Sequence, residues 1–191
     1  MLKKMAQIFT FTILTLFCSS VFANPMFGEY QNQFSLSLGQ SIRRGLNTEE
    51  LFYADMTYSQ PTTFFRRAAR RNIELGGFKG NDCTETICSA DNGYPRTANL
   101  SQYDLALFGL SGDVLLFSIG NFYTNVRLGA YIKSETTNRI RSAFTFGEKI
   151  TFGYRMNRIN LEFYARHFSN GTLTNENSGQ NFYGLSIAIN L

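Results

Sequence analysis

The feature that most constrains the fold is a two-residue alternation of hydrophobicity that begins near Gln33 and recurs up to the C-terminus. Large apolar residues alternate with small or polar ones, as in Phe34-Ser35-Leu36-Ser37-Leu38-Gly39 and Tyr183-Gly184-Leu185-Ser186-Ile187-Ala188-Ile189. Such alternation is typical of half-buried β-strands. Ser, Gly, Asn and Thr could not build the core of a soluble sandwich, whereas a membrane barrel turns apolar residues to lipid and polar ones to its interior. The pattern therefore predicts an all-β, transmembrane outer-membrane barrel.

The pattern predicts eight antiparallel strands, at residues 33–42, 50–58, 67–78, 102–117, 122–133, 143–155, 159–169 and 181–191. Several have about 9–13 residues, the length that a tilted strand needs to cross a bilayer. Eight is the expected count for the smallest outer-membrane barrels, whose interiors are filled by side chains. We interpret Ser111-Gly112-Asp113 as a bulge or a turn. The alternative fold is a soluble lipocalin-like barrel, which would need its large apolar residues facing inward.

Composition excludes several other classes of protein. A chain of 191 residues allows one domain. Its residues are 43% apolar and only 17% charged, which excludes a disordered chain, a coiled coil and a nucleic-acid-binding arm. No internal run of about 18 apolar residues exists, so a bundle of membrane helices is excluded. The single histidine, His167, argues against a His-rich metal site. We expect no metal, no cofactor and no nucleic-acid partner.

The first 23 residues resemble a secretory signal. Lys3 and Lys4 precede a short apolar run at 8–17, and Val21-Phe22-Ala23 has small residues where signal peptidase requires them. We predict cleavage before Asn24 and a single barrel domain over 24–191, with a buried N-terminal helix as the alternative. Phe17 is too bulky to precede a lipidated Cys18.

Two cysteines remain in the mature chain, Cys83 and Cys88, in a polar stretch bounded by glycines. Outside the cytoplasm this spacing favours a small disulfide loop. A metal site is the weaker alternative, because only two thiols and no histidine are nearby.

Topology places one unusual pair of side chains near the outer rim. If the chain ends in the periplasm, the seventh strand runs outward and His167 and Ser169 lie at its outer end, at the depth of lipopolysaccharide. Residues two apart share a strand face, and an imidazole beside a hydroxyl can activate it as a nucleophile. The alternative for His167 is a place in an interfacial aromatic belt. Both groups on the lipid-facing side suit a substrate that is itself a lipid.

Asn181 is a candidate third member of this site. A hairpin closed by residues 170–180 places Asn181 across from His167 on the same face. Its carbonyl can accept the imidazole N–H and fix the tautomer, although it supplies no negative charge. The alternative is a residue at the end of a loop that makes an Asx-type hydrogen bond.

The C-terminal part of the chain resembles the outer-membrane lipid A 3-O-deacylase (PagL) family. The similar segments are Phe144–Glu148, Gly153–Arg155, His167–Leu173 and Asn177–Tyr183. The resemblance covers about 143–191 and implies an eight-stranded barrel that hydrolyses the acyl ester at position 3 of lipid A, with a Ser-His-Glu triad and no metal. It implies that Ser169 is the nucleophile, His167 the base, and the Asn170 amide part of an oxyanion hole.

Two positions depart from the family pattern. Asn181 stands where the family has its triad glutamate, and Gly171-Thr172 replaces Ala-Gly. Glu148 and Glu176 are candidates for the missing acid. For Glu148 we favour an ion pair, with Lys149 or Arg166, over the catalytic role.

A basic cluster, Arg66-Arg67-Ala68-Ala69-Arg70-Arg71, begins at a predicted periplasmic turn, far from outer-leaflet phosphates. We interpret it as a solvated rim or as a surface attracted to inner-leaflet headgroups.

The sequence thus predicts a multi-pass barrel of the Gram-negative outer membrane that acts as a serine esterase on lipid A, within a lipid bilayer. The alternative is a non-enzymatic barrel with a structural or adhesive role, and a homodimer is left open.

Overall fold

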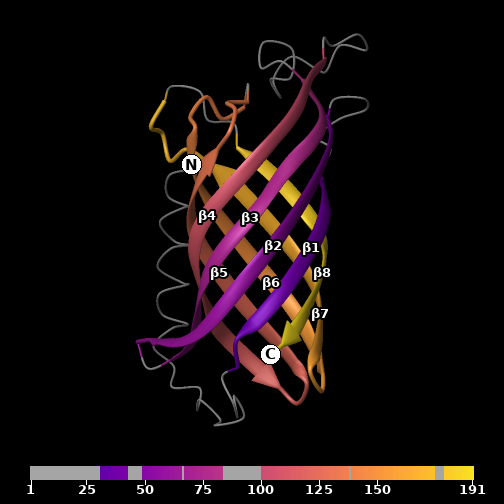
Figure 1. Cartoon of the computed structure of the whole chain (residues 1–191), viewed down its shortest axis with the longest axis vertical. Helices are drawn as coiled ribbons and strands as arrows, with labels where there is room; N and C mark the ends of the chain where they lie inside the picture. The colour runs from indigo at the N-terminus through magenta and orange to yellow at the C-terminus, as the bar shows by residue number, and fades with distance from the viewer. Residues whose placement is uncertain (1–30, 43–48, 66, 84–99, 138, 175–178) are drawn as a thin grey trace, which may run out of the picture.

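The chain forms a closed barrel of eight antiparallel strands, each paired with its neighbour in sequence, with β1 also paired to β8 (Figure 1). This computed structural model describes residues 31–42, 49–65, 67–83, 100–137, 139–174 and 179–191. The strands are β1 Gln33–Ser41, β2 Glu49–Phe64, β3 Arg67–Cys83, β4 Leu100–Ile119, β5 Phe122–Lys133, β6 Phe144–Met156, β7 Ile159–Ser169 and β8 Gln180–Asn190. The expected signal segment and the expected Cys83–Cys88 disulfide lie outside what is described, since Cys88 and the Cys83 side chain are not included. The described residues contain no helix that is long and apolar enough to cross a membrane.

The predicted fold class and strand count are confirmed, but three strands are longer than predicted. β2 continues to Phe64, β3 to Cys83, and β4 runs from Leu100 to Ile119. Backbone pairing carries these hairpins past the point where the alternation of side chains ends, because main-chain hydrogen bonds are indifferent to side-chain polarity.

The expected bulge or turn at Ser111-Gly112-Asp113 is wrong. These residues pair without a break with Arg70–Asn72 on one side and Arg127–Gly129 on the other. Asp113 faces inward, where it accepts a hydrogen bond from Asn72, so its polarity marks the barrel interior rather than a turn. The register shift of β4 lies between Leu115 and Phe117.

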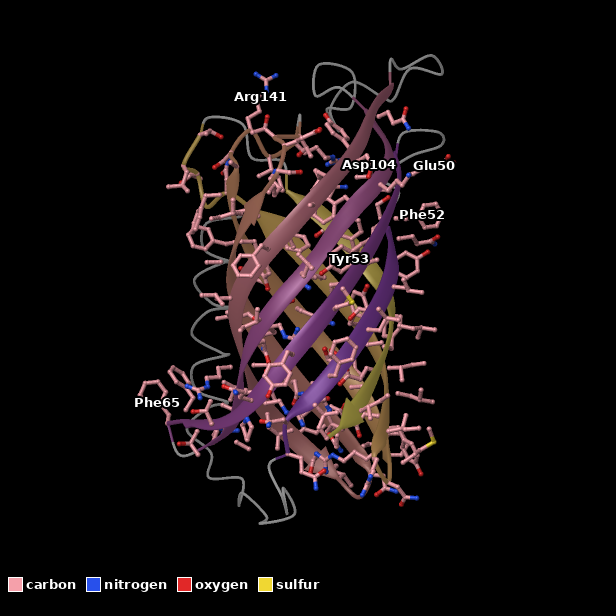
Figure 2. All side chains as sticks on the ribbon, in the orientation of Figure 1. Glu50, Phe52, Tyr53, Phe65, Asp104 and Arg141 are labelled. Carbon is pink, nitrogen blue, oxygen red and sulfur yellow. The ribbon has the colours of Figure 1, made fainter. Side chains whose placement is uncertain are left out.

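The wall of the barrel is apolar outside and polar inside, as the alternation predicts. On β1 and β8, for example, Leu38 and Leu185 are 60% and 67% exposed, whereas Ser37 and Ser186 are 0% and 2% exposed. Figure 2 shows the same contrast at one step of β2, where Phe52 points outward and Tyr53 lies within the barrel. Apolar surface of this extent fits a wall surrounded by lipid.

Two clusters of side chains lie side by side in the interior. The first is an aromatic cluster, whose fully buried rings include Tyr53, Phe78, Tyr131, Phe168 and Phe182. A charged cluster lies beside it. Its ion pairs join Arg166 to Asp55 and Glu74, and Arg127 to Glu74 and Asp113.

The two ends of the barrel differ. At one end β4 and β5 are joined by the two-residue turn Gly120-Asn121, and β6 and β7 by Asn157-Arg158. β2, β3 and β8 have an end there too. We call this the short-turn end; it is the lower end in Figure 1. The opposite, long-connection end carries the links between β1 and β2, β3 and β4, β5 and β6, and β7 and β8.

Candidate active site

The centre of the site is a hydrogen bond across β7 and β8. His167 is the register partner of Asn181, and His167 Nδ1 lies 2.7 Å from Asn181 Oδ1. An amide oxygen only accepts, so the Nδ1 atom carries the proton and the Nε2 atom is left as the basic nitrogen. Both side chains are partly exposed and lie on the outer face, near the long-connection end of the wall.

Register places the site residues in two rows on the outer wall. One row runs from Leu128 on β5 through Glu148 on β6 and His167 on β7 to Asn181 on β8. One step closer to the long-connection end, Ser169 on β7 lies opposite Phe146 on β6. The wall therefore brings a hydroxyl, an imidazole, an amide and a carboxylate to one outward-facing patch.

Ser169 occupies the last position of β7. Its backbone carbonyl accepts a hydrogen bond from Thr145 Oγ1 at 2.7 Å, which ties the end of β7 to β6. Within the part of the chain that the structure describes, the Ser169 hydroxyl makes no hydrogen bond to the imidazole. Catalytic hydrogen bonds are often long without substrate and tighten when it binds.

Asn170 organises the connection that follows β7. Its buried side chain accepts a hydrogen bond from the Thr172 amide at 3.0 Å and donates to Thr174 Oγ1 at 2.5 Å. Gly171 and Thr172 both have positive φ angles, +60° and +70°. A left-handed conformation is strained for a β-branched residue such as Thr172. The hydrogen bond from the Thr172 amide to the Asn170 side chain therefore stabilises a tight turn that Thr172 would not adopt by itself.

Sequence reasoning missed Gly179, which packs against the imidazole of His167. A Cβ atom at Gly179 would lie 2.4 Å from His167 Cε1 and 3.1 Å from Nε2, and its φ angle is +66°. The carbonyl of Gly179 accepts a hydrogen bond from the buried Arg139 at 3.4 Å. The only sequence signal is a glycine just before a strand, which is common at turns and indicates no site.

The expected ion pair of Glu148 with Lys149 or Arg166 is wrong. Both cations lie inside the barrel: Lys149 bonds to Ser37 and Ser186, and Arg166 pairs with interior carboxylates. Glu148 is on the outer face, because strand alternation puts it opposite Lys149. Within the described chain no cation lies within ion-pair distance of Glu148. Glu176, the other candidate acid, lies outside the described residues.

An apolar groove of about 300 Å³ begins beside His167, Asn181 and Glu148. Val126, Ile150 and Ala165 line it one register row nearer the short-turn end. Ala165 is small, and the next row along the wall carries Phe152 and Phe163. A second hollow of about 530 Å³ lies among that aromatic row. The described residues contain no group of three or more His, Cys, Asp or Glu side chains placed to hold a metal ion.

The comparison with protein-family models identifies the family, and the similar solved structures are outer-membrane proteins. The family model for lipid A 3-O-deacylase (PagL) matches residues 85–190, more than half of the chain. The crystal structure of the outer membrane enzyme PagL is similar at 15% identity, over 83% of this chain and 99% of that one, with a TM-score of 0.52. The backbone structure of the Yersinia pestis outer membrane protein Ail is 10% identical over 84% and 100% of the two chains, with a TM-score of 0.47. A search of curated proteins finds no match. By the family match, the chain belongs to the lipid A 3-O-deacylase (PagL) family.

Proposed function

We propose that this protein is a serine esterase of the Gram-negative outer membrane that hydrolyses the acyl chain ester-linked at position 3 of lipid A. Family membership supports the substrate class. The observation that carries the chemistry is the His167–Asn181 hydrogen bond of 2.7 Å on the lipid-facing side of the wall, with Ser169 next along the same face. A base at that position serves a substrate that lies beside the barrel in the membrane.

The reaction follows from the tautomer of His167. Nε2 takes the hydroxyl proton as Ser169 Oγ attacks the ester carbonyl, and Asn181 holds the protonated Nδ1. The Asn170 amide stabilises the oxyanion. The intermediate collapses with proton transfer from His167 to the departing sugar oxygen, which leaves a hydroxyl at position 3 and an acyl group on Ser169. Water, deprotonated by the same imidazole, then releases the fatty acid.

The groove gives the acyl chain a place to lie. It starts at His167 and continues over apolar side chains toward the short-turn end, so a chain whose ester lies at Ser169 can extend along it. We place the long-connection end at the cell surface, because surface loops of such barrels are longer than periplasmic turns. The site then faces the outer leaflet, where lipopolysaccharide resides.

We also propose that Glu148 supplies the negative charge that Asn181 lacks. Glu148 is the direct register partner of His167 and lines the same groove, and no cation in the described chain neutralises it. Side chains of directly opposed residues lie within about 5.5 Å at Cβ, close enough for a carboxylate to stabilise the imidazolium that forms in the transition state. Asn181 then orients the ring, and Glu148 acts on it through charge.

Mass spectrometry of lipid A tests the proposal. Membranes with the wild-type protein should lose one hydroxyacyl chain from lipid A, and membranes with Ser169→Ala should keep it. The Ser169→Ala barrel should remain folded, as judged by its heat-dependent mobility on gels. An unchanged lipid A spectrum with the wild-type protein would favour the inert structural or adhesive barrel instead. Full activity in Ser169→Ala would exclude this serine as the nucleophile.

A further inference from the structure

The β2–β3 hairpin extends beyond both of its neighbours at the short-turn end. Pairing of β1 with β2 stops at Gln33 and Ser59, and pairing of β4 with β3 starts at Val114 and Ala69. β2 and β3 nevertheless stay paired to Phe64 and Arg67. Residues 60–62 therefore extend β2 beyond β1 along β3, and residues 63–65, 67 and 68 form a two-stranded tip that pairs with neither β1 nor β4. Together these residues, 60–65, 67 and 68, are here called the rim ribbon. Pro61 fits this position, because a proline cannot donate to a second neighbouring strand.

The rim ribbon points sideways from the barrel rather than along its axis (Figure 1). Two phenylalanines form its tip. Phe64 and Phe65 are 55% and 86% exposed, and their rings contact each other edge to face with centroids 4.4 Å apart. Figure 2 shows Phe65 as the outermost side chain on that side. Phe65 has a φ angle of +48°, a conformation that Gly or Asn adopts more easily, so the tip holds an aromatic residue at a strained position.

The charge of the same segment is entirely positive. From Ser59 to Asn72 the sequence contains Arg67, Arg70 and Arg71 among its basic residues and no acidic residue. Arg67 donates to the Leu116 carbonyl and Arg70 to Gln33, so both are anchored at the root of the ribbon. Arg71 is exposed on the outer face. A guanidinium presents several donors that match phosphate oxygens.

We propose that the rim ribbon is a membrane-interface anchor: Phe64 and Phe65 insert among lipid at the short-turn end, and Arg71 binds phosphate of anionic phospholipid headgroups. Aromatic residues favour the membrane–water interface, and basic residues near it are attracted to anionic lipid. The sideways direction of the ribbon keeps its tip in the plane of the bilayer, which distinguishes a lipid partner from a protein in the aqueous compartment. The anchor is independent of catalysis.

The chain contains no tryptophan, so a single substitution provides a specific reporter. The full-length Phe65→Trp protein would be reconstituted in phosphatidylcholine vesicles with and without phosphatidylglycerol. We expect emission at shorter wavelength than that of tryptophan in water, and quenching by lipids with brominated acyl chains. Phe64→Trp provides the same measurement if Phe65→Trp does not fold.

Two control sites calibrate the signal. Phe163→Trp, on the outer wall, should be quenched by brominated lipid in both kinds of vesicle. Asn121→Trp, in the tight turn between β4 and β5 at the same end, should emit as in water. Emission of Phe65→Trp equal to that of Asn121→Trp, with quenching by aqueous acrylamide only, would overturn the anchor.

Arg71→Gln tests the headgroup contact in the Phe65→Trp background. Phosphatidylglycerol should increase the quenching of the introduced tryptophan by brominated lipid, and Arg71→Gln should abolish that increase while leaving the quenching in phosphatidylcholine. Quenching that is the same in both vesicles before the arginine is changed would overturn the phosphate contact. Raising the salt concentration should weaken the phosphatidylglycerol effect, because exposed charges are screened.

Discussion

In the proposed site, Asn181 stands where the resemblance to the family implies a carboxylate beside His167. Asn181 fixes the ring through Nδ1 but carries no charge to stabilise the imidazolium. The loss of one transition-state charge interaction is worth about 2–4 kcal/mol, or roughly 30- to 1,000-fold in rate. Glu148, on the other side of the same row, is therefore the residue on which the rate should depend.

The Glu148→Gln substitution should lower the rate constant for deacylation by roughly 30- to 1,000-fold with little change in KM, because the charge acts on the transition state. Asn181→Glu should preserve or raise activity, and Asn181→Ala should lower it less than Ser169→Ala does. Adding Asn181→Glu to Glu148→Gln should restore most of the lost rate. Rates would be measured by lipid A mass spectrometry in one membrane assay.

The double variant separates charge from structure. Rescue by a carboxylate on the opposite side of the ring cannot come from a structural effect of Glu148. If Glu148→Gln and both Asn181 variants all leave the rate unchanged, neither residue acts on His167 and the third member of the triad is wrongly assigned.

Gly179→Ala should reduce deacylation by about 100-fold while the barrel stays folded. Its Cβ would lie 2.4 Å from His167 Cε1, so the ring must move, and displacements near 1 Å cost about that much. Gly120→Ala is a matched control, because Gly120 also has a positive φ angle, +56°, but a Cβ there meets nothing within 4 Å. Equal losses in the two variants would attribute the effect to backbone strain instead.

Among the strands, β5 and β7 were predicted with the ends that the structure shows, and β1, β6 and β8 to within one residue. Alternation over Phe34–Leu38 or Leu185–Ile189 is unbroken, and each outward residue faces lipid. The outward placement of His167, Ser169 and Asn181 follows from the same alternation, although their catalytic roles stay predictions. The lengths of β2 and β3 could not be predicted, because Pro61, Gly76, Gly77 and Gly80 interrupt the side-chain pattern without ending the pairing.

The rest of the site depends on contacts between segments distant in sequence. Arg139 lies 40 residues before Gly179, and no local pattern relates them. The sequence favours an ion pair of Glu148 with Lys149 or Arg166, whereas in the fold both cations lie inside the barrel and Glu148 lies on the outer face. Residues adjacent on one strand therefore point to opposite faces and stay apart, whereas residues directly opposite each other on paired strands lie side by side.

Ala165→Phe should fill the groove on β7 and impair the binding of substrate. Ala165 lies between His167 and Phe163 on the outer face, so a phenyl ring at this position would block the groove along which the acyl chain extends. We expect KM to rise about tenfold or more, because pocket contacts the size of a methylene already contribute about 1–3 kcal/mol. Leu36→Phe on β1, outward-facing but outside the groove, should leave the kinetics unchanged. Unaltered kinetics for Ala165→Phe would show that the acyl chain lies elsewhere.

Considered as a whole, the barrel depends on charge compensation inside its wall. Arg166 is completely buried, with one guanidinium nitrogen 2.9 Å from Glu74 and 3.4 Å from Asp55. Arg127 pairs with Glu74 as well, at 3.3 Å. Removing one member of such a cluster leaves a buried charge uncompensated, which costs far more than the same change at the surface.

Arg166→Met should therefore lower the free energy of unfolding by about 3–5 kcal/mol, measured by urea titration in lipid vesicles. Lys79→Gln is the control, because its pair with Asp104, at 3.4 Å, has side chains that are 70% and 74% exposed. Exposed pairs contribute about 0–1 kcal/mol. An unfolding free energy of Arg166→Met equal to that of Lys79→Gln would mean that Glu74 and Asp55 are compensated by other groups.

In the proposed mechanism, the outward position of His167 and Ser169 on a closed wall also determines how enzyme and substrate meet. Encounters occur by diffusion in two dimensions, so the relevant concentration is the mole fraction of substrate in the leaflet. Adding inert lipid to the same vesicles should slow turnover, whereas adding buffer should not. The fatty acid leaves sideways into the bilayer, and the trimmed lipid remains where it was, so turnover changes the composition of the surrounding membrane without any passage through water.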